Sequence, residues 1–324
     1  MGSSSDAQVS FLIWRLYYVT AKRTLDVVRK RFEQFGVSLV ERRNVVPEND
    51  STTFFVCSGM QDFKSLFLRP DGSKLGTVQT CVRTNDIELI GDGSHLSSFR
   101  MLGNFSFGGN DYQQSVEMWH LILNDLSVPV SHITVHPSQQ NHKKLWRQLG
   151  YNIRLDEECV WSDGNIGGFC CEVFVGDLEV GNLVNTLGHS TDVGFGLERL
   201  QQVVEGKSRV DETSLFDTTL HPVVRDHNKT LDLLFDNGVK PGNKGPNYIC
   251  RKLLRRLIPY LSGKENFVFG EWLLDEQQRR ERCIKQCKNK INTRKYKDKT
   301  DLWWWDTLGI LPHELMELKL TNSK

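Results

Sequence analysis

The chain has 324 residues, a length that predicts about two domains with substantial hydrophobic cores. Its 41 Lys and Arg nearly balance 40 Asp and Glu, so a formal charge of +1 excludes nucleic-acid binding by bulk charge alone. The 39% hydrophobic and 25% charged composition excludes a collagenous or low-complexity protein. Apolar runs fall short of the roughly 18 residues that cross a bilayer, so we expect a soluble protein without a membrane partner.

The first element predicted in chain order is a helix at residues 20–36. Leu25, Val28, Phe32 and Phe35 recur at intervals of three and four, and Gly36 follows as a stop. Further along, β-rich runs separated by turn residues predict strands, interrupted by two more helices. The predicted strands are 38–46, 52–56, 77–82, 99–107, 133–135, 173–175 and 178–184, and the helices are 111–126 and 141–149. The first 205 residues are therefore expected to form an α+β unit with an antiparallel sheet.

Beyond residue 206 the apolar spacing changes to that of helices, so a second domain is predicted to start near residue 210. Residues 251–300 hold 15 Lys and Arg against 6 Asp and Glu, a net charge of +9. Such a run is commonly a solvated face. An excess of this size also favours a partner with a phosphate backbone.

The cysteine and histidine spacings do not predict a metal site. The eight cysteines lack a paired CxxC pattern and are expected to be reduced. Cys283 and Cys287 stand one helical turn apart without further ligands. His132 and His136 have HxxxH spacing but fall in a predicted strand. We therefore predict no zinc.

Three segments carry the most specific signal. They are 45–52 with 57–64, then 80–86 with 99–108, and finally 191–200. In this order they resemble motifs 1, 2 and 3 of the class II aminoacyl-tRNA synthetases. The strings MLGNFSF (101–107) and GFGLER (194–199) are specifically similar to alanyl-tRNA synthetases, and the resemblance extends over about residues 20–315.

This resemblance implies a fold and a domain plan. It implies an α+β fold with a class II synthetase antiparallel β-sheet flanked by helices, followed by a smaller all-helical tRNA-recognition domain. We expect an N-terminal extension at 1–19, a catalytic domain at 20–205 and an acceptor-stem-binding domain at 206–324. Residues 7–25 lack acidic residues and weakly resemble a mitochondrial targeting segment, although an extra N-terminal helix is the favoured interpretation.

The resemblance assigns the ATP site. Arg83 and Arg199 match the motif 2 and motif 3 arginines and are the expected catalytic residues. Adenylate formation needs cations that neutralise charge on the phosphates, and the planar guanidinium of arginine suits both phosphate and purine. Met101, Phe105 and Gly196 are the other expected ATP-binding residues. In isolation, each arginine would be interpreted as an ordinary surface ion-pair residue.

The resemblance also assigns an alanine pocket and magnesium ligands. Trp161 would wall a small cavity, Asn182 would hydrogen-bond the substrate, and Val184 would limit side-chain size. Asp192 would hold the ammonium group beside Gly194, because a desolvated cation demands a charge partner. Core packing for Trp161 and helix capping for Asp192 remain alternatives. Glu172 or Asp177 is a weak candidate for holding the Mg²⁺ that accompanies ATP.

The helical domain resembles the segments that contact the tRNA acceptor stem. The residues of the family that recognise a G·U wobble pair match Asn243 and Asp306, whose groups suit base edges. A turn role for Asn243 stays open. Arg251, Arg255 and Arg256 are expected to contact the backbone. The run 303–305 (Trp-Trp-Trp) is interpreted as core anchoring in preference to base stacking.

The resulting prediction is an alanine–tRNA ligase that uses ATP and Mg²⁺ and binds L-alanine and the acceptor stem of an alanine-accepting tRNA. The chain stops before the family's editing and oligomerisation domains, so we expect no editing and a monomer, in the cytoplasm or alternatively the mitochondrial matrix. One rival is a paralogue that activates alanine for an acceptor other than tRNA. Another is an inactive RNA-binding relic. Two departures from the family are a short loop after Arg83 and Arg100 in place of the usual Glu. The Arg100 exchange is expected to reverse the charge beside the ATP site.

Overall fold

The computed structural model describes residues 21–48, 50, 52–261, 267, 269–291, 293–296, 298–310 and 312–321, with the side chains of 305, 306, 312, 313 and 321 left out. The predicted extension 1–19 lies outside the described residues. The chain divides into two compact units between Leu233 and Leu234. Residues 206–233, which we assigned to the helical domain, thus fall in the first unit, while the functional division of the chain stays a prediction.

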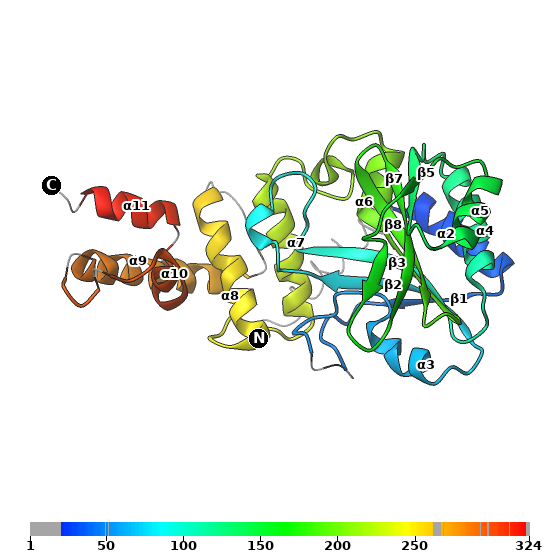
Figure 1. Ribbon diagram of the computed structural model, residues 1–324. Coiled ribbons are helices and arrows are strands. Elements are labelled where there is room, and N and C mark those ends of the chain that lie inside the picture. The colour runs from blue at the N-terminus through cyan, green and yellow to red at the C-terminus, as the bar shows by residue number, and fades with distance from the viewer. Residues whose placement is uncertain are drawn as a thin grey trace, which may run out of the picture. The chain divides into compact units, whose positions relative to one another are not determined.

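The first unit is built on one nine-stranded mixed sheet (Figure 1). Its strand order is β1-β2-β3-β9-β8-β7-β4-β5, and β6 pairs with β7. The β1–β2 and β4–β5 pairs are parallel, and the other pairs are antiparallel. The strands are β1 (Ser38–Arg42), β2 (Lys74–Val82), β3 (Ser98–Ser106), β4 (His132–Val135), β5 (Ile153–Leu155), β6 (Val160–Ser162), β7 (Gly167–Val175), β8 (Leu178–Thr186) and β9 (Ser190–Gly196).

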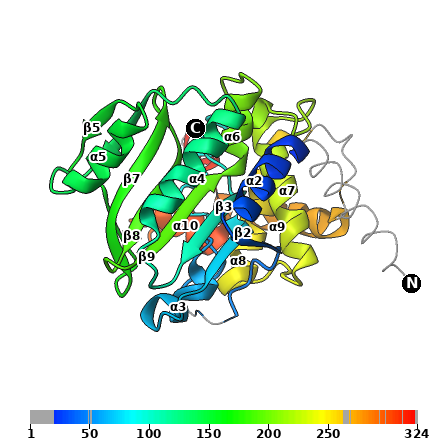
Figure 2. The ribbon, with the colours of Figure 1, turned by 90° about the vertical axis from the view of Figure 1, so that its right-hand side faces the viewer.

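Helices cover one face of this sheet. In Figure 2, α2 (Lys22–Gln34), α4 (Tyr112–Asp125) and α6 (Leu197–Val204) lie in front of the strands. The other helices that begin in the unit are α3 (Lys64–Leu68), α5 (Gln140–Gln148) and α7 (Pro222–Asp236). The predicted helix at 20–36 is confirmed, because Leu25, Val28 and Phe32 are buried and Gly36 ends it with φ +69°. The left-handed conformation at the helix end favours glycine.

The predicted strand at 52–56 is wrong. This segment forms bends, and its backbone is joined to neighbouring segments at Val56, whose N–H donates to Val45 and whose carbonyl accepts from Val82. Phe55 and Val56 are buried whereas Phe54 is 57% exposed, so the β-rich run that suggested a strand anchors a loop instead.

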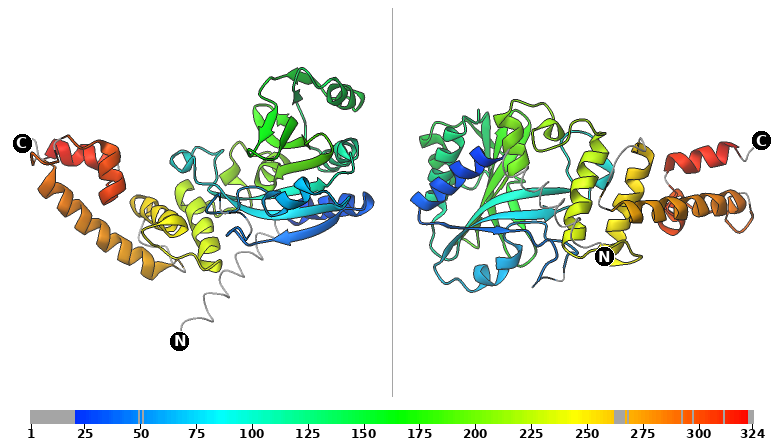
Figure 3. Two further views of the ribbon diagram at one scale, coloured as in Figure 1. Left: turned by 60° about the horizontal axis from the view of Figure 1, so that its bottom comes forward. Right: turned by 180° about the vertical axis from the view of Figure 1, so that it is seen from behind.

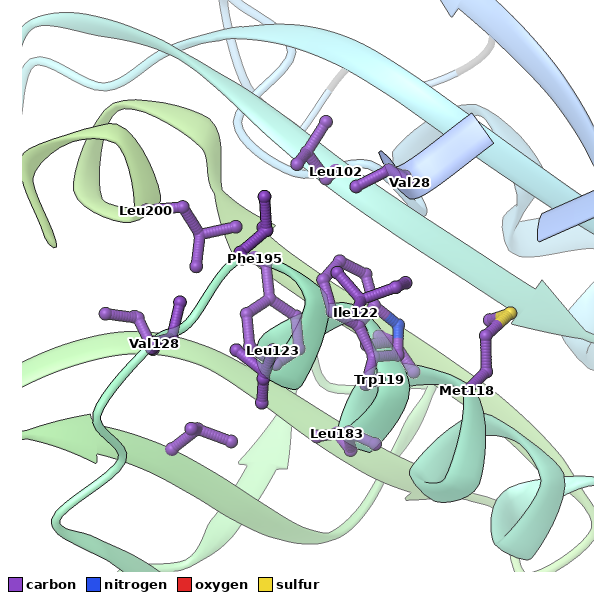
Figure 4. Packing of buried hydrophobic residues seen from close by; sticks show 14 of the residues in the cluster. Val28, Leu102, Met118, Trp119, Ile122, Leu123, Val128, Leu183, Phe195 and Leu200 are labelled. Atoms are coloured by element: carbon purple, nitrogen blue, oxygen red, sulfur yellow. The ribbon is translucent and has the colours of Figure 1, made fainter. Parts of the chain in front are cut away.

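The core lies between the sheet and the helices that cover it. Val193 and Phe195 alternate along β9 toward this side, and the Phe195 ring stacks on Trp119 of α4 at a centroid distance of 3.8 Å (Figure 4). Leu102 and Leu183 belong to the same buried cluster. Because side chains alternate along a strand, Asp192, Gly194 and Gly196 must face the opposite side of the sheet.

The second compact unit is helical, as predicted. Its helices are α8 (Gly245–Leu257), α9 (Gly270–Lys290), α10 (Asp301–Leu308) and α11 (Pro312–Thr321), visible from two further directions in Figure 3. Trp304 is 1% exposed and packs with Cys287, Ile310 and Leu315. The core-anchoring interpretation therefore holds for Trp304. Trp305 lies outside the described side chains.

Two other observations bear on the expectations from sequence. All eight cysteines carry free thiols. Among the described residues, no helix has the length and apolar character needed to span a bilayer.

Candidate functional site

The sheet register gathers seven predicted site residues on the face away from the covering helices. Three strands contribute, with β9 in the middle: Met101 pairs with Gly196, Phe105 with Asp192, Asn182 with Gly194, and Val184 with Asp192. Directly paired residues on neighbouring strands point to the same face. Residues far apart in sequence thus form one continuous band.

A cleft of about 280 Å³ opens over part of this band. It is lined by both predicted catalytic arginines and by four other predicted residues, namely Arg83, Met101, Asn182, Gly194, Gly196 and Arg199. The fold therefore brings the motif 2 and motif 3 arginines into one site.

The cleft also contains residues that the sequence prediction missed. They are Asp86, Ile90, Ser94, His95, Leu96 and Phe99 from the loop after Arg83 and the start of β3, together with Glu179, Val180, Gly181 and Glu198. From sequence, the loop after Arg83 was predicted only to be short. No residue spacing in it indicates that it lines the cleft. Glu198 could have been found, since it precedes Arg199 within the motif itself.

Arg83 follows directly after β2 and is exposed. Its Nε donates to the Cys57 carbonyl at 2.8 Å, and its guanidinium lies 5.0 Å from the centroid of the Phe99 ring. This carbonyl and this aromatic face orient the side chain without neutralising its charge. The guanidinium thus remains a cation available to an anionic ligand.

Arg199 lies in the first turn of α6. Its Nη1 donates to the Glu179 carbonyl at 2.8 Å and lies 3.4 Å from the Glu179 carboxylate, with both side chains 37% exposed. An ion pair this exposed contributes little to stability and is readily exchanged for a ligand phosphate. Arg199 is therefore a second cation that a ligand can recruit.

Gly196 leaves part of the cleft floor without a side chain. A Cβ at this position would come no closer than 3.6 Å to Arg199, which is an ordinary contact, and φ is −74°. The protein's own packing therefore does not require glycine here. A flat backbone suits close approach by a ligand.

The predicted alanine pocket extends along the band beyond the cleft lining. Trp161 packs against Val184, Cys159 and Cys170, and also against the cluster that includes Phe105. Val184 and Phe105 are each 1% exposed. Both side chains are thus buried beside Trp161, outside the cleft lining.

Asp192 is the titratable group of this pocket. Burial, with a smaller contribution from the charge of Asp163, raises the pKa of Asp192 to about 7. Among the described residues, it makes no ion pair with a cation. Ionising a buried carboxylate without a partner costs free energy, and binding of an ammonium group beside it would offset that cost.

Asp163 itself belongs to an ion-pair chain. Lys64 of α3 lies 2.8 Å from both Asp163 and Asp50. These charges join the segment before β2 to the β6–β7 hairpin that carries Trp161. The hairpin is therefore held in place by charge as well as by apolar packing.

The candidate magnesium ligands lie outside the cleft lining. Glu172 pairs with Asn182 in the sheet and accepts a hydrogen bond from Thr134, and burial raises its pKa. Asp177 is exposed in the turn between β7 and β8. In the described part of the chain, no cluster of three or more His, Cys, Asp or Glu side chains forms a metal site. The described residues thus offer no preformed magnesium site, and we derive no step through the metal.

Arg100, which we expected beside the ATP site, does not line the cleft. Its neighbours Phe99 and Met101 line the cleft, whereas Arg100 faces the other side of β3, where it lines a small depression with Leu25, Val78 and Thr80. Its backbone N–H donates to the Glu198 carboxylate at 2.9 Å. The positive charge of Arg100, where the family usually has a Glu, therefore lies on the face of the sheet opposite the cleft.

In the helical unit, three of the predicted tRNA-binding residues have internal partners. The Asn243 side-chain oxygen accepts a hydrogen bond from Arg251, and Arg251 and Arg255 both pair with Glu276 of α9, which is 2% exposed. Arg256 is partly exposed, and the Asp306 side chain lies outside the described residues. Contacts of all five with tRNA stay predictions.

With this geometry in hand, comparisons with known proteins place the fold. Residues 29–182 match the family described as tRNA synthetases class II (A). This match makes just under half of the chain similar to the class II tRNA synthetases.

Within that class, the curated relatives are alanine–tRNA ligases. The chain is 29% identical over 307 residues to the alanine–tRNA ligase of Desulfitobacterium hafniense, covering 74% of this chain and 35% of that protein. It is 32% identical over 305 residues to the one from Magnetococcus marinus, covering 71% of this chain and 35% of the relative. The chain thus spans about a third of the length of these relatives.

Among solved structures, a pyrrolysyl-tRNA synthetase of Desulfitobacterium hafniense is similar with a TM-score of 0.42 and 16% identity. The match covers 59% of this chain and 71% of that one.

Proposed function

We propose that the protein is an alanine–tRNA ligase, which activates L-alanine with ATP and transfers the alanyl group to the 3′ end of an alanine-accepting tRNA. The observation that carries this proposal is the single cleft lined by Arg83, Arg199 and the glycine-rich end of β9. Support comes from the similarity to alanine–tRNA ligases over more than two thirds of this chain.

The proposed chemistry uses substrate atoms as nucleophiles. An oxygen of the alanine carboxylate attacks the α-phosphorus of ATP, the bond to the β-phosphate oxygen breaks, and alanyl-adenylate and pyrophosphate form. Arg83 and Arg199 would stabilise the charge that develops on the phosphates, while Met101 and Gly196 shape the cleft floor. Positioning then replaces a catalytic serine or cysteine.

The alanine would sit along β8 and β9. Asp192 would pair with the ammonium group, and Asn182 would hydrogen-bond the substrate beside Gly194. The buried Val184 and the partly buried Trp161 would limit the side chain to a methyl group. Steric limits reject larger side chains well. A missing methyl group is worth only about 1–3 kcal/mol, so glycine would be rejected poorly.

Recognition of tRNA would fall to the helical unit. Residues 251–300 carry a net charge of +9, which suits an RNA backbone. Because Arg251 and Arg255 pair with a buried glutamate, their contribution to RNA binding would be to hold α8 against α9. Asn243, Arg256 and Asp306 remain the proposed direct contacts.

The test is charging of a short acceptor-stem RNA with labelled alanine. We expect the wild-type protein to charge it and Asn243→Asp to charge it at least about tenfold more slowly, because this variant keeps the oxygen that accepts from Arg251 but loses the amide donor. Exchange of pyrophosphate into ATP should be equal in both. Activation without charging would contradict the proposal and support an acceptor other than tRNA, and RNA binding without activation would support the inactive relic.

A further inference from the structure

A buried polar cluster joins α7 to the start of β3. Ser97, Ser98, Asp226, His227 and Thr230 are each 1% exposed or less. Burying a carboxylate and several hydroxyl groups is costly unless hydrogen bonds satisfy them. The site predicted from sequence does not explain the burial of these polar side chains, because none of them is among the predicted site residues.

The carboxylate of Asp226 holds Ser97 at two points. One oxygen accepts from the Ser97 backbone N–H at 2.8 Å, and the other accepts from the Ser97 hydroxyl. His227 Nδ1 lies 2.9 Å from the second oxygen. Hydrogen bonds to a carboxylate are roughly twice as strong as those between neutral groups. The Asp226 carboxylate therefore restrains the position of Ser97 strongly.

The next turn of α7 holds Ser98 in the same way. Thr230 donates to the Ser98 hydroxyl at 2.7 Å, and the Lys229 ammonium donates to the Ser98 carbonyl at 2.6 Å. Lys229 also lies 3.7 Å from the carboxylate of Glu198, which lines the cleft next to Arg199. One helix face therefore fixes both serines and approaches the motif 3 helix.

Ser97 in turn fixes the backbone of Arg83. The Arg83 N–H donates to the Ser97 carbonyl at 3.0 Å, directly beyond the last β2–β3 pair, Val82 with Ser98. This bond closes the loop that lines the cleft. Displacement of Ser97 would move Arg83, and a catalytic group misplaced by about 1 Å can lose roughly 10²-fold in rate.

We propose that Asp226 is a positioning residue for Arg83, acting through Ser97. This inference rests on the proposed function, because the rate it controls is that of alanine activation. Asp226 does not line the cleft, so it acts through the loop backbone and not on the substrate.

The test compares Asp226→Asn with Asp111→Asn in alanine-dependent pyrophosphate exchange. Asp111 is a matched control, since its carboxylate accepts from Ser106 at the opposite end of β3 and pairs with Lys74. We expect Asp226→Asn to lower kcat by about tenfold or more while the KM for alanine changes less than about twofold, and Asp111→Asn to retain the wild-type kcat. A role in stability alone would lower the melting temperature and leave kcat per folded molecule unchanged, which would overturn the proposal.

A second variant keeps the test decisive if Asp226→Asn does not fold. Ser97→Ala removes the hydroxyl contact and retains the backbone bond to Asp226, so kcat should fall severalfold at unchanged KM. Wild-type kcat in folded Ser97→Ala would overturn the inference. Absence of exchange in the wild-type protein would instead overturn the proposed function, so the two failures are distinguishable.

Discussion

The arginines of the cleft and those of the helical unit have opposite surroundings. Arg83 and Arg199 are oriented mainly by carbonyl oxygens and by an aromatic ring, and they keep their charge accessible. Arg251 and Arg255 face the nearly inaccessible Glu276. A guanidinium that stays exposed can serve a ligand, whereas one that compensates a buried carboxylate serves the fold.

Loss of a cleft arginine should give the largest effect. Arg199→Ala is expected to lower the kcat of alanine-dependent pyrophosphate exchange by at least about 10²–10³-fold, because it removes a cation from the developing phosphate charge. Its Glu179 partner is itself 37% exposed, so the melting temperature should change little. Steady-state kinetics and thermal unfolding of the same preparation check both statements. A loss of activity matched by a loss of folded protein would contradict them.

Loss of the buried Glu276 should have the opposite effect and lower stability while leaving activity in place. Glu276→Gln leaves two arginines without their carboxylate, so the free energy of unfolding of the helical unit should fall by about 3 kcal/mol while pyrophosphate exchange persists. Glu281→Gln, at an exposed position of the same helix, is the control. Equal stability of the two variants in denaturant titrations would show that the Glu276 network is not structural.

The pH dependence of alanine use should follow Asp192. Its pKa of about 7 means that the carboxylate which pairs with ammonium disappears as pH falls through 7. The kcat/KM for alanine should therefore rise about tenfold between pH 6 and pH 8 and then level off. Asp163→Asn removes a neighbouring negative charge and should shift the profile to lower pH. A flat wild-type profile would show that Asp192 does not titrate in this role.

The smallest structural effect is expected at Gly196. Gly196→Ala should change the free energy of unfolding by less than about 0.5 kcal/mol, because the added methyl group meets only ordinary contacts. It should nevertheless raise the KM for ATP severalfold by occupying the cleft floor. An unchanged KM would mean that nucleotide does not approach this backbone.

Local patterns predicted much of the local structure. The apolar spacing around Leu25 and Phe32 placed α2, whereas β9, which carries much of the site, was not among the predicted strands. Other features that escaped prediction are non-local. The pairing of Arg251 with Glu276 joins two helices, and the cleft-lining loop after Arg83 is held by a serine that α7 grips from more than a hundred residues away. Arg100 was misplaced although a local rule was enough: with Met101 assigned to the ATP site, alternation along the predicted strand 99–107 puts Arg100 on the opposite face.

The most direct test of the central claim is exchange of labelled pyrophosphate into ATP, measured with alanine and without tRNA. The account predicts exchange that depends on alanine, is lost in Arg83→Ala and Arg199→Ala, and persists in Glu276→Gln. Absence of exchange in the folded wild-type protein, or exchange that survives removal of both cleft arginines, would contradict it.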